Sequence, residues 1–148
     1  MRSTMFLAGM AFASSIVLCL AAAPADAETV HYKAMIMPAS EVPPVKDSKA
    51  TGQLAATFDT VTKVLSYDVT YADLTGPASA AHFHGPAPVG TNAGVMVPIK
   101  GELASPIKGE ATLTDAQAKA LTDGDMYFNI HTAANKGGEM RGQVLKGM

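Results

Sequence analysis

The chain has 148 residues, 48% of them hydrophobic, and a formal net charge of −2 at pH 7. This length suits one domain with a self-sufficient core, and the lack of a basic excess argues against a nucleic-acid partner. The only cysteine, Cys19, lies in an N-terminal apolar run, so the sequence after that run offers no disulfide, thiolate metal site or cysteine nucleophile.

Residues 1–27 have the pattern of a secretory signal peptide. Met1-Arg2 is a short positive start, residues 5–23 are apolar, and Ala25-Asp26-Ala27 forms a small-x-small cleavage site. The apolar run approaches the roughly 20 residues that span a bilayer, but the cleavage site favours a removed signal. We therefore expect an exported protein, periplasmic or extracellular, whose mature domain is residues 28–148 and has no membrane span.

The remaining sequence predicts mostly β-strands separated by turns. Strands are expected at residues 29–37, 52–58, 64–71, 82–84, 94–99, 108–113, 126–132 and 139–145. The segment 64–71 alternates most clearly between apolar and polar residues, as a half-buried strand does. The Glu41-Val42-Pro43-Pro44 segment ends the first strand, because proline cannot donate a hydrogen bond to a β-ladder.

One helix is expected, between the strands at 108–113 and 126–132. Thr114 and Gln117 have the spacing of a capping box, and Gly124 stands where a C-cap glycine would end the helix at Asp123. With about eight short strands and regular turns, the fold class predicted is all-β: an antiparallel two-sheet β-sandwich with one short helix.

Three histidines on two of these strands form the candidate site. Alternation in a strand puts His82 and His84 on one face and Phe83 on the other. His131 lies on the polar face of the strand 126–132, whose other face is apolar. If the two strands are neighbours in one sheet, the three imidazoles converge.

Three imidazole ligands and an open fourth position suit a zinc or copper ion. His31 and Glu139 are the candidates for a fourth ligand. The polar residues expected around the ligands are Asn129, Glu139, Arg141 and Glu41. Glu139 and Arg141 share the face of His131 only if the intervening loop has an odd number of residues, and a slip of one residue reverses their side.

A structural role is the competing interpretation, and the sequence alone favours it. The histidines would then bind backbone groups at crowded turns, and Glu139 with Arg141 would form an ion pair. A separate copper hypothesis rests on Met35 and Met37, which share a face with His31, since thioethers bind Cu(I). Methionine in a strand, however, is more often core filler.

Several blocks of sequence resemble the CHRD domain, named for chordin. They are Ser40–Pro44, Leu74–Ala78, Ala80–Ala87, Leu113–Gln117, Tyr127–Asn135 and Gly137–Gln143, and they span nearly all of the chain from Lys33 to Val144. The resemblance is to the short bacterial exported form of the family. It implies a short exported protein whose role is largely undefined. We expect a non-catalytic binding or structural module of the periplasm or cell surface, monomeric, whose partner is an unknown protein, polysaccharide or metal ligand.

The same family is similar to copper,zinc superoxide dismutase in one detail, a His-x-His strand in a β-sandwich. That enzyme uses six histidines and an aspartate, whereas this chain has four histidines. A dismutase-like redox enzyme is therefore the least favoured of the three functional hypotheses, after the non-catalytic module and the copper- or zinc-binding protein.

Overall fold

The computed structural model describes residues 28–147, so the expected signal peptide lies outside the described residues. The elements are β1 (Thr29–Ile36), a 3₁₀ helix η1 (Pro38–Ser40), β2 (Thr51–Asp59), β3 (Val64–Ala72), β4 (Ala78–His84), β5 (Val95–Pro98), β6 (Ile107–Thr112), α1 (Asp115–Asp123), β7 (Tyr127–Thr132), β8 (Met140–Gln143) and β9 (Leu145–Lys146). No helix among these is long and apolar enough to cross a membrane.

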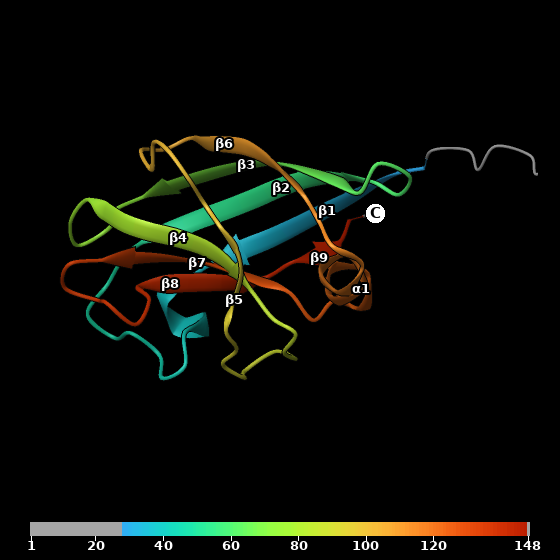
Figure 1. Ribbon diagram of the computed structural model, residues 1–148. Coiled ribbons are helices and arrows are strands. Elements are labelled where there is room, and N and C mark those ends of the chain that lie inside the picture. Colours follow the sequence, from blue (N-terminus) through green and yellow to red (C-terminus); the bar gives the residue numbers. More distant parts are fainter. Residues whose placement is uncertain (1–27, 148) are drawn as a thin grey trace, which may run out of the picture.

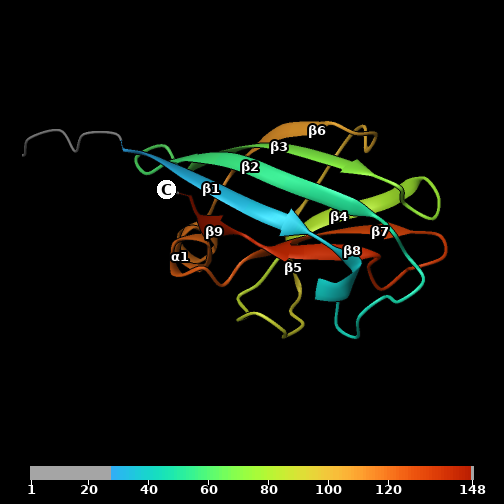
Figure 2. The same ribbon diagram turned by 180° about the vertical axis from the view of Figure 1, so that it is seen from behind.

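The strands form two antiparallel sheets that lie face to face (Figure 1). One sheet has the order β6-β3-β2-β1-β9 and the other the order β5-β4-β7-β8. Figure 2 shows the same two layers from behind, with α1 beside β9 at one end. The predicted all-β, two-sheet sandwich with one short helix is confirmed.

The core lies between the sheets and follows the period-2 alternation of the strands. From β3 it receives Leu65 and Val69, and from β4 and β7 it receives Phe83 and Phe128, all fully buried. The rings of Phe83 and Phe128 meet edge to face with centroids 4.9 Å apart, a favoured aromatic arrangement. Because these residues face inward, their alternating neighbours in β4 and β7 face outward.

Two predicted elements changed in extent. The strand expected at 82–84 begins at Ala78, because β4 pairs with β7 back to Thr132. The strand expected at 139–145 is divided: β8 belongs to the four-stranded sheet, and β9 pairs with β1 in the other. Val144, fully buried, marks the point where the chain passes from one sheet to the other.

The expected helix has the predicted caps. Thr114 Oγ1 accepts a hydrogen bond from the Gln117 N–H, and the Gln117 side chain accepts one from the Thr114 N–H, which is the capping box. Gly124 takes the left-handed conformation with φ 78°, as a C-terminal glycine does. Ala120 and Leu121 turn toward the core, so α1 closes one end of the sandwich.

Candidate metal centre

The outward face of β4 and β7 carries the candidate site. These strands are antiparallel neighbours, with His82 opposite Asn129 and His84 opposite Tyr127. His131 lies two residues along β7 from Asn129, so it is the diagonal neighbour of His82, within reach of a long side chain. The condition on which the sequence prediction depended, that the two strands adjoin, is met.

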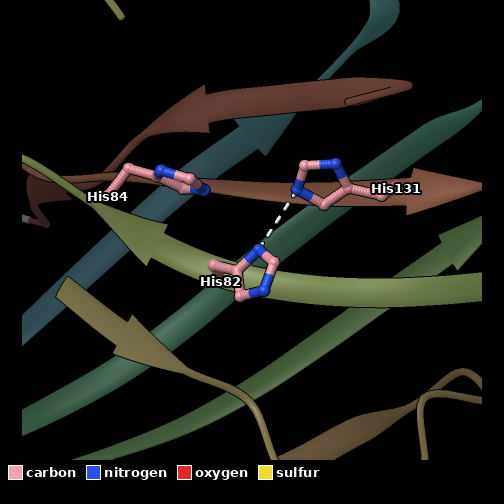
Figure 3. Close-up of side chains that lie close together, drawn as sticks. All are labelled: His82, His84 and His131. Atoms are coloured by element: carbon pink, nitrogen blue, oxygen red, sulfur yellow. Dashed lines mark hydrogen bonds between the residues drawn. The ribbon is translucent and has the colours of Figure 1, made fainter. Parts of the chain in front are cut away.

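The three rings converge on a common space (Figure 3). Nδ1 of His82 lies 3.1 Å from Nε2 of His131. One ring nitrogen from each of His82, His84 and His131 can be chosen so that all three lie within 4.8 Å of one another. We call these three residues the histidine cluster.

Backbone carbonyls determine which nitrogens face that space. Nδ1 of His131 donates to the carbonyl oxygen of Lys136 at 2.9 Å, and Nδ1 of His84 donates to that of Ala93 at 3.0 Å. Each bond leaves Nε2 as the nitrogen with a lone pair. Metal-binding histidines are oriented in this way by a hydrogen bond from the second ring nitrogen.

Electrostatics favours the neutral form of two of the three rings. Burial lowers the pKa of His82, and the neighbouring His131 and His84 lower it further. Burial also lowers the pKa of His84, against the opposing effect of its hydrogen bond to Ala93. A neutral imidazole is the form that binds a metal ion.

His84 is the most enclosed member of the histidine cluster, with 8% of its surface exposed. Its ring stacks on that of Tyr127, with centroids 4.9 Å apart and an interplanar angle of 4°. The Tyr127 hydroxyl in turn bonds the backbone of Ala93. A hydrogen bond from the Gly85 N–H to the Gly94 carbonyl closes the loop 85–94. The bonds to Ala93 hold this loop against His84 and Tyr127.

Arg141 and Glu41 lie beside the cluster as a buried pair. The Arg141 guanidinium lies 4.6 Å from the centre of the Tyr127 ring, and its Nε is 3.9 Å from Oε2 of Glu41. Nε also donates to the carbonyl oxygen of Ser40, and Nη1 to Oδ1 of Asn92. Burial raises the pKa of the Glu41 carboxyl against the opposing charge of Arg141. The expected ion pair between Glu139 and Arg141 is wrong, because the partner of Arg141 is Glu41.

Glu139 does not join the histidine cluster. Its fully buried carboxylate accepts hydrogen bonds from the Ser48, Thr75 and Thr132 hydroxyls and the Asn135 amide. The loop between β7 and β8, residues 133–139, does have an odd number of residues. Glu139 nevertheless precedes the first residue of β8, so its side chain does not follow the alternation of that strand. The expectation that it is a fourth ligand or a neighbour of the ligands is therefore corrected: Glu139 joins three loops at one end of the sandwich.

His31 is not a fourth ligand either. It lies on β1 in the five-stranded sheet and is exposed. Met35 and Met37, with 64% and 42% of their surfaces exposed, are not core filler, contrary to expectation. They lie on or just beyond β1 and share its outward face with His31, away from the core.

Asn129 contacts one member of the histidine cluster. Its Oδ1 is 3.0 Å from Nε2 of His84, and Arg141 stands opposite it on β8. Sequence reasoning placed Tyr127 on the polar face but missed its stacking on His84. It also missed the carbonyls of Ala93 and Lys136, because loop conformation, not residue type, aims them.

The model of the CHRD domain family matches residues 32–144. No curated protein and no solved structure gives a match to the chain. The match begins in β1 and ends just before β9, so it includes the whole four-stranded sheet, most of the five-stranded sheet and every residue of the histidine cluster.

Proposed function

The chain belongs to the CHRD domain family, and from this premise we propose that it is an exported, non-catalytic module that binds one Zn²⁺ or Cu²⁺ ion. The ligands are His82 through Nδ1 and His84 and His131 through Nε2. Export rests on the signal pattern of residues 1–27 and agrees with the secreted, extracellular proteins in which CHRD domains occur.

One observation carries the metal proposal: two of the three ligands are already oriented by carbonyl oxygens. Holding a ring in one orientation costs conformational freedom, and a histidine with a purely structural role has no need to present its free nitrogen to two other imidazoles. In this protein His84 and His131 extend from adjacent strands, and one ring nitrogen of each lies within 4.8 Å of the other and of one from His82. Nε2 of His84 also lies 3.0 Å from Oδ1 of Asn129, and Nε2 of His131 lies 3.1 Å from Nδ1 of His82. The structural interpretation explains each bond separately but not the convergence of the three nitrogens.

The non-catalytic part of the proposal rests on the count of ligands. A dismutase-like centre needs more imidazoles than the cluster supplies, and the fourth histidine of the chain, His31, lies on the other sheet. We therefore assign the site to metal binding, with a protein or polysaccharide partner as the alternative if no metal binds.

Calorimetric titration of the mature, chelator-stripped protein with Zn²⁺ and Cu²⁺ tests the proposal. We expect one ion per chain with sub-micromolar affinity, and loss of that binding in a His82→Ala/His84→Ala double variant. His31→Ala is the matched control, because it removes an imidazole from the other sheet and leaves the affinity unchanged. Absence of binding to the wild-type protein would reject the proposal.

A further inference from the structure

We infer that the side-chain oxygen of Asn129 is the fourth ligand, so that the site binds Cu²⁺ with three nitrogens and one oxygen; this rests on the proposed function. The expectation from sequence was only that Asn129 orients a ligand. Its position in the structure supports a direct role.

The first support is the hydrogen-bond inventory of His84. Its Nδ1 faces the carbonyl oxygen of Ala93 at 3.0 Å, and its Nε2 faces Oδ1 of Asn129, also at 3.0 Å. A neutral imidazole has a single N–H and can donate to one of these oxygens only. The lone pairs of Nε2 and Oδ1 then face each other, and a cation between them turns this repulsion into two coordinate bonds.

The second support is the spacing of the donor atoms. Ligands about 2.0–2.1 Å from a metal ion lie roughly 2.8 Å apart in a square-planar arrangement and about 3.4 Å apart in a tetrahedral one. The distance from His84 Nε2 to Asn129 Oδ1 is 3.0 Å, and that from His82 Nδ1 to His131 Nε2 is 3.1 Å. Both pairs therefore have the separation of adjacent ligands. The second pair is a hydrogen bond from His82 Nδ1–H to His131 Nε2, so a metal ion bound there replaces that proton, which moves to His82 Nε2 or to solvent.

The third support is the position of the Glu41 carboxylate close to the Asn129 amide. Asn129 and Glu41 are 3% and 5% exposed, and Oε1 of Glu41 has no hydrogen-bond partner among the described residues. A Cβ built on Gly138 would lie 2.5 Å from that Oε1 and 2.8 Å from Nδ2 of Asn129, so the two groups occupy the space that a glycine leaves. With its nitrogen beside the carboxylate, the amide presents its oxygen to His84.

The donor set points to copper. Nitrogen and oxygen ligands in a tetragonal arrangement are typical of Cu²⁺, which such sites also bind more tightly than Zn²⁺. An amide oxygen in the fourth position leaves no place in the plane of the ligands for a water molecule. The presence or absence of that water is measurable.

Electron spin echo modulation of the Cu²⁺-loaded mature protein in D₂O tests this inference, because it detects deuterated water bound in the ligand plane. We expect no such water in the wild type, and its appearance in Asn129→Ala together with an affinity about tenfold lower or more. Asn129→Asp, which keeps an oxygen, should exclude the water again. Gln53→Ala, which removes an exposed amide from β2 in the other sheet, is the control and should match the wild type.

Three results would overturn the inference. One is water in the ligand plane of the wild type, which needs no variant to fold. Another is an Asn129→Ala protein whose Cu²⁺ affinity and spin echo spectrum equal those of the wild type. In both cases Cu²⁺ binding by the histidines, and so the proposed function, would stand. If the wild type binds no Cu²⁺ at all, the inference and the proposed function fail together.

Discussion

The carbonyl oxygens of Ala93 and Lys136 each hold one imidazole in a single orientation. At the scale of the residue, this is what separates His84 and His131 from a surface histidine such as His31. A ring that already donates through Nδ1 offers only Nε2 to a ligand. The affinity of the histidine cluster should thus depend on backbone atoms that no side-chain substitution removes.

Metal binding by the cluster should persist below the ordinary histidine pKa. Protonation competes with metal for the same lone pair, and the pKa values of His82 and His84 lie below the usual 6.5. Zn²⁺ affinity measured between about pH 7.5 and 5 should therefore stay high at pH 6.5 and fall only at lower pH. A loss of half the binding above pH 6.5 would contradict the lowered pKa values.

The buried carboxyl of Glu139 should make the stability of the fold depend on pH in the acid range. Burial alone would raise the pKa of its carboxyl, but hydrogen bonds from Thr132, Thr75 and Ser48 outweigh burial and lower the pKa from 4.5 to about 2. A lowered pKa stabilises the fold above pH 4.5, and this contribution is lost as the pH falls toward 2.

Glu139→Gln should cost roughly 1.5–3 kcal/mol of unfolding free energy at pH 7, the value of hydrogen bonds to a buried charge. Urea titrations at neutral pH and at about pH 3 measure this difference. The cost should shrink at the lower pH, where the unfolded chain's carboxyl is protonated. An equal cost at both pH values would show that the carboxylate's charge is not what stabilises the fold.

Two loops, 38–45 and 85–94, are joined to the outward face of the four-stranded sheet by Arg141. At the scale of the element, its guanidinium connects β8 to the carbonyl of Ser40 and the side chain of Asn92. Because the loop 85–94 also carries Ala93, the same contacts help to hold His84.

Arg141→Ala should therefore cost roughly 3–5 kcal/mol, since it leaves the Glu41 charge buried without a partner. Hydrogen exchange should increase in both loops. Lys108→Ala is the control: its ion pair with Asp68 is exposed, with 66% of the Lys108 side chain accessible, and its loss should cost less than about 1 kcal/mol. Equal losses in the two variants would refute the role given to Arg141.

The elements were predictable to different degrees, for physical reasons. The faces of β4 and β7 follow from period-2 alternation, which is local, so His82, His84 and His131 were assigned correctly to outward faces. That β4 and β7 adjoin is a long-range pairing that no local pattern specifies. Glu139 was misplaced because it stands just outside β8, beside Gly138 with φ 126°, where alternation does not hold. The division of β8 from β9 likewise depends on which sheet each segment joins.

The two outward faces of the sandwich differ. At the scale of the whole molecule, β1 exposes His31, Met35 and other side chains directly, whereas loops cover part of β4, β7 and β8. A metal ion in the histidine cluster would join β4 to β7 in the central strands of that second sheet. Because those strands also supply Phe83 and Phe128 to the core, binding should stabilise the whole domain.

Saturating Zn²⁺ or Cu²⁺ should raise the midpoint of thermal unfolding. A ligand at one hundred times its dissociation constant adds about 2.7 kcal/mol to the stability of the folded state, which for a domain of this size is roughly 10 °C. Differential scanning calorimetry with and without the ion measures the shift. It should vanish in the His82→Ala/His84→Ala variant and remain in His31→Ala; a shift that survives in the double variant would place the ion elsewhere.

The most direct test of the metal centre is a crystal structure of the Cu²⁺- or Zn²⁺-loaded protein with anomalous diffraction recorded at the metal's absorption edge. We predict a single strong peak about 2.0–2.1 Å from His82 Nδ1, His84 Nε2 and His131 Nε2, with the Ala93 and Lys136 hydrogen bonds intact. A loaded crystal with no peak at the histidine cluster, or with its peak on another surface, would contradict the account.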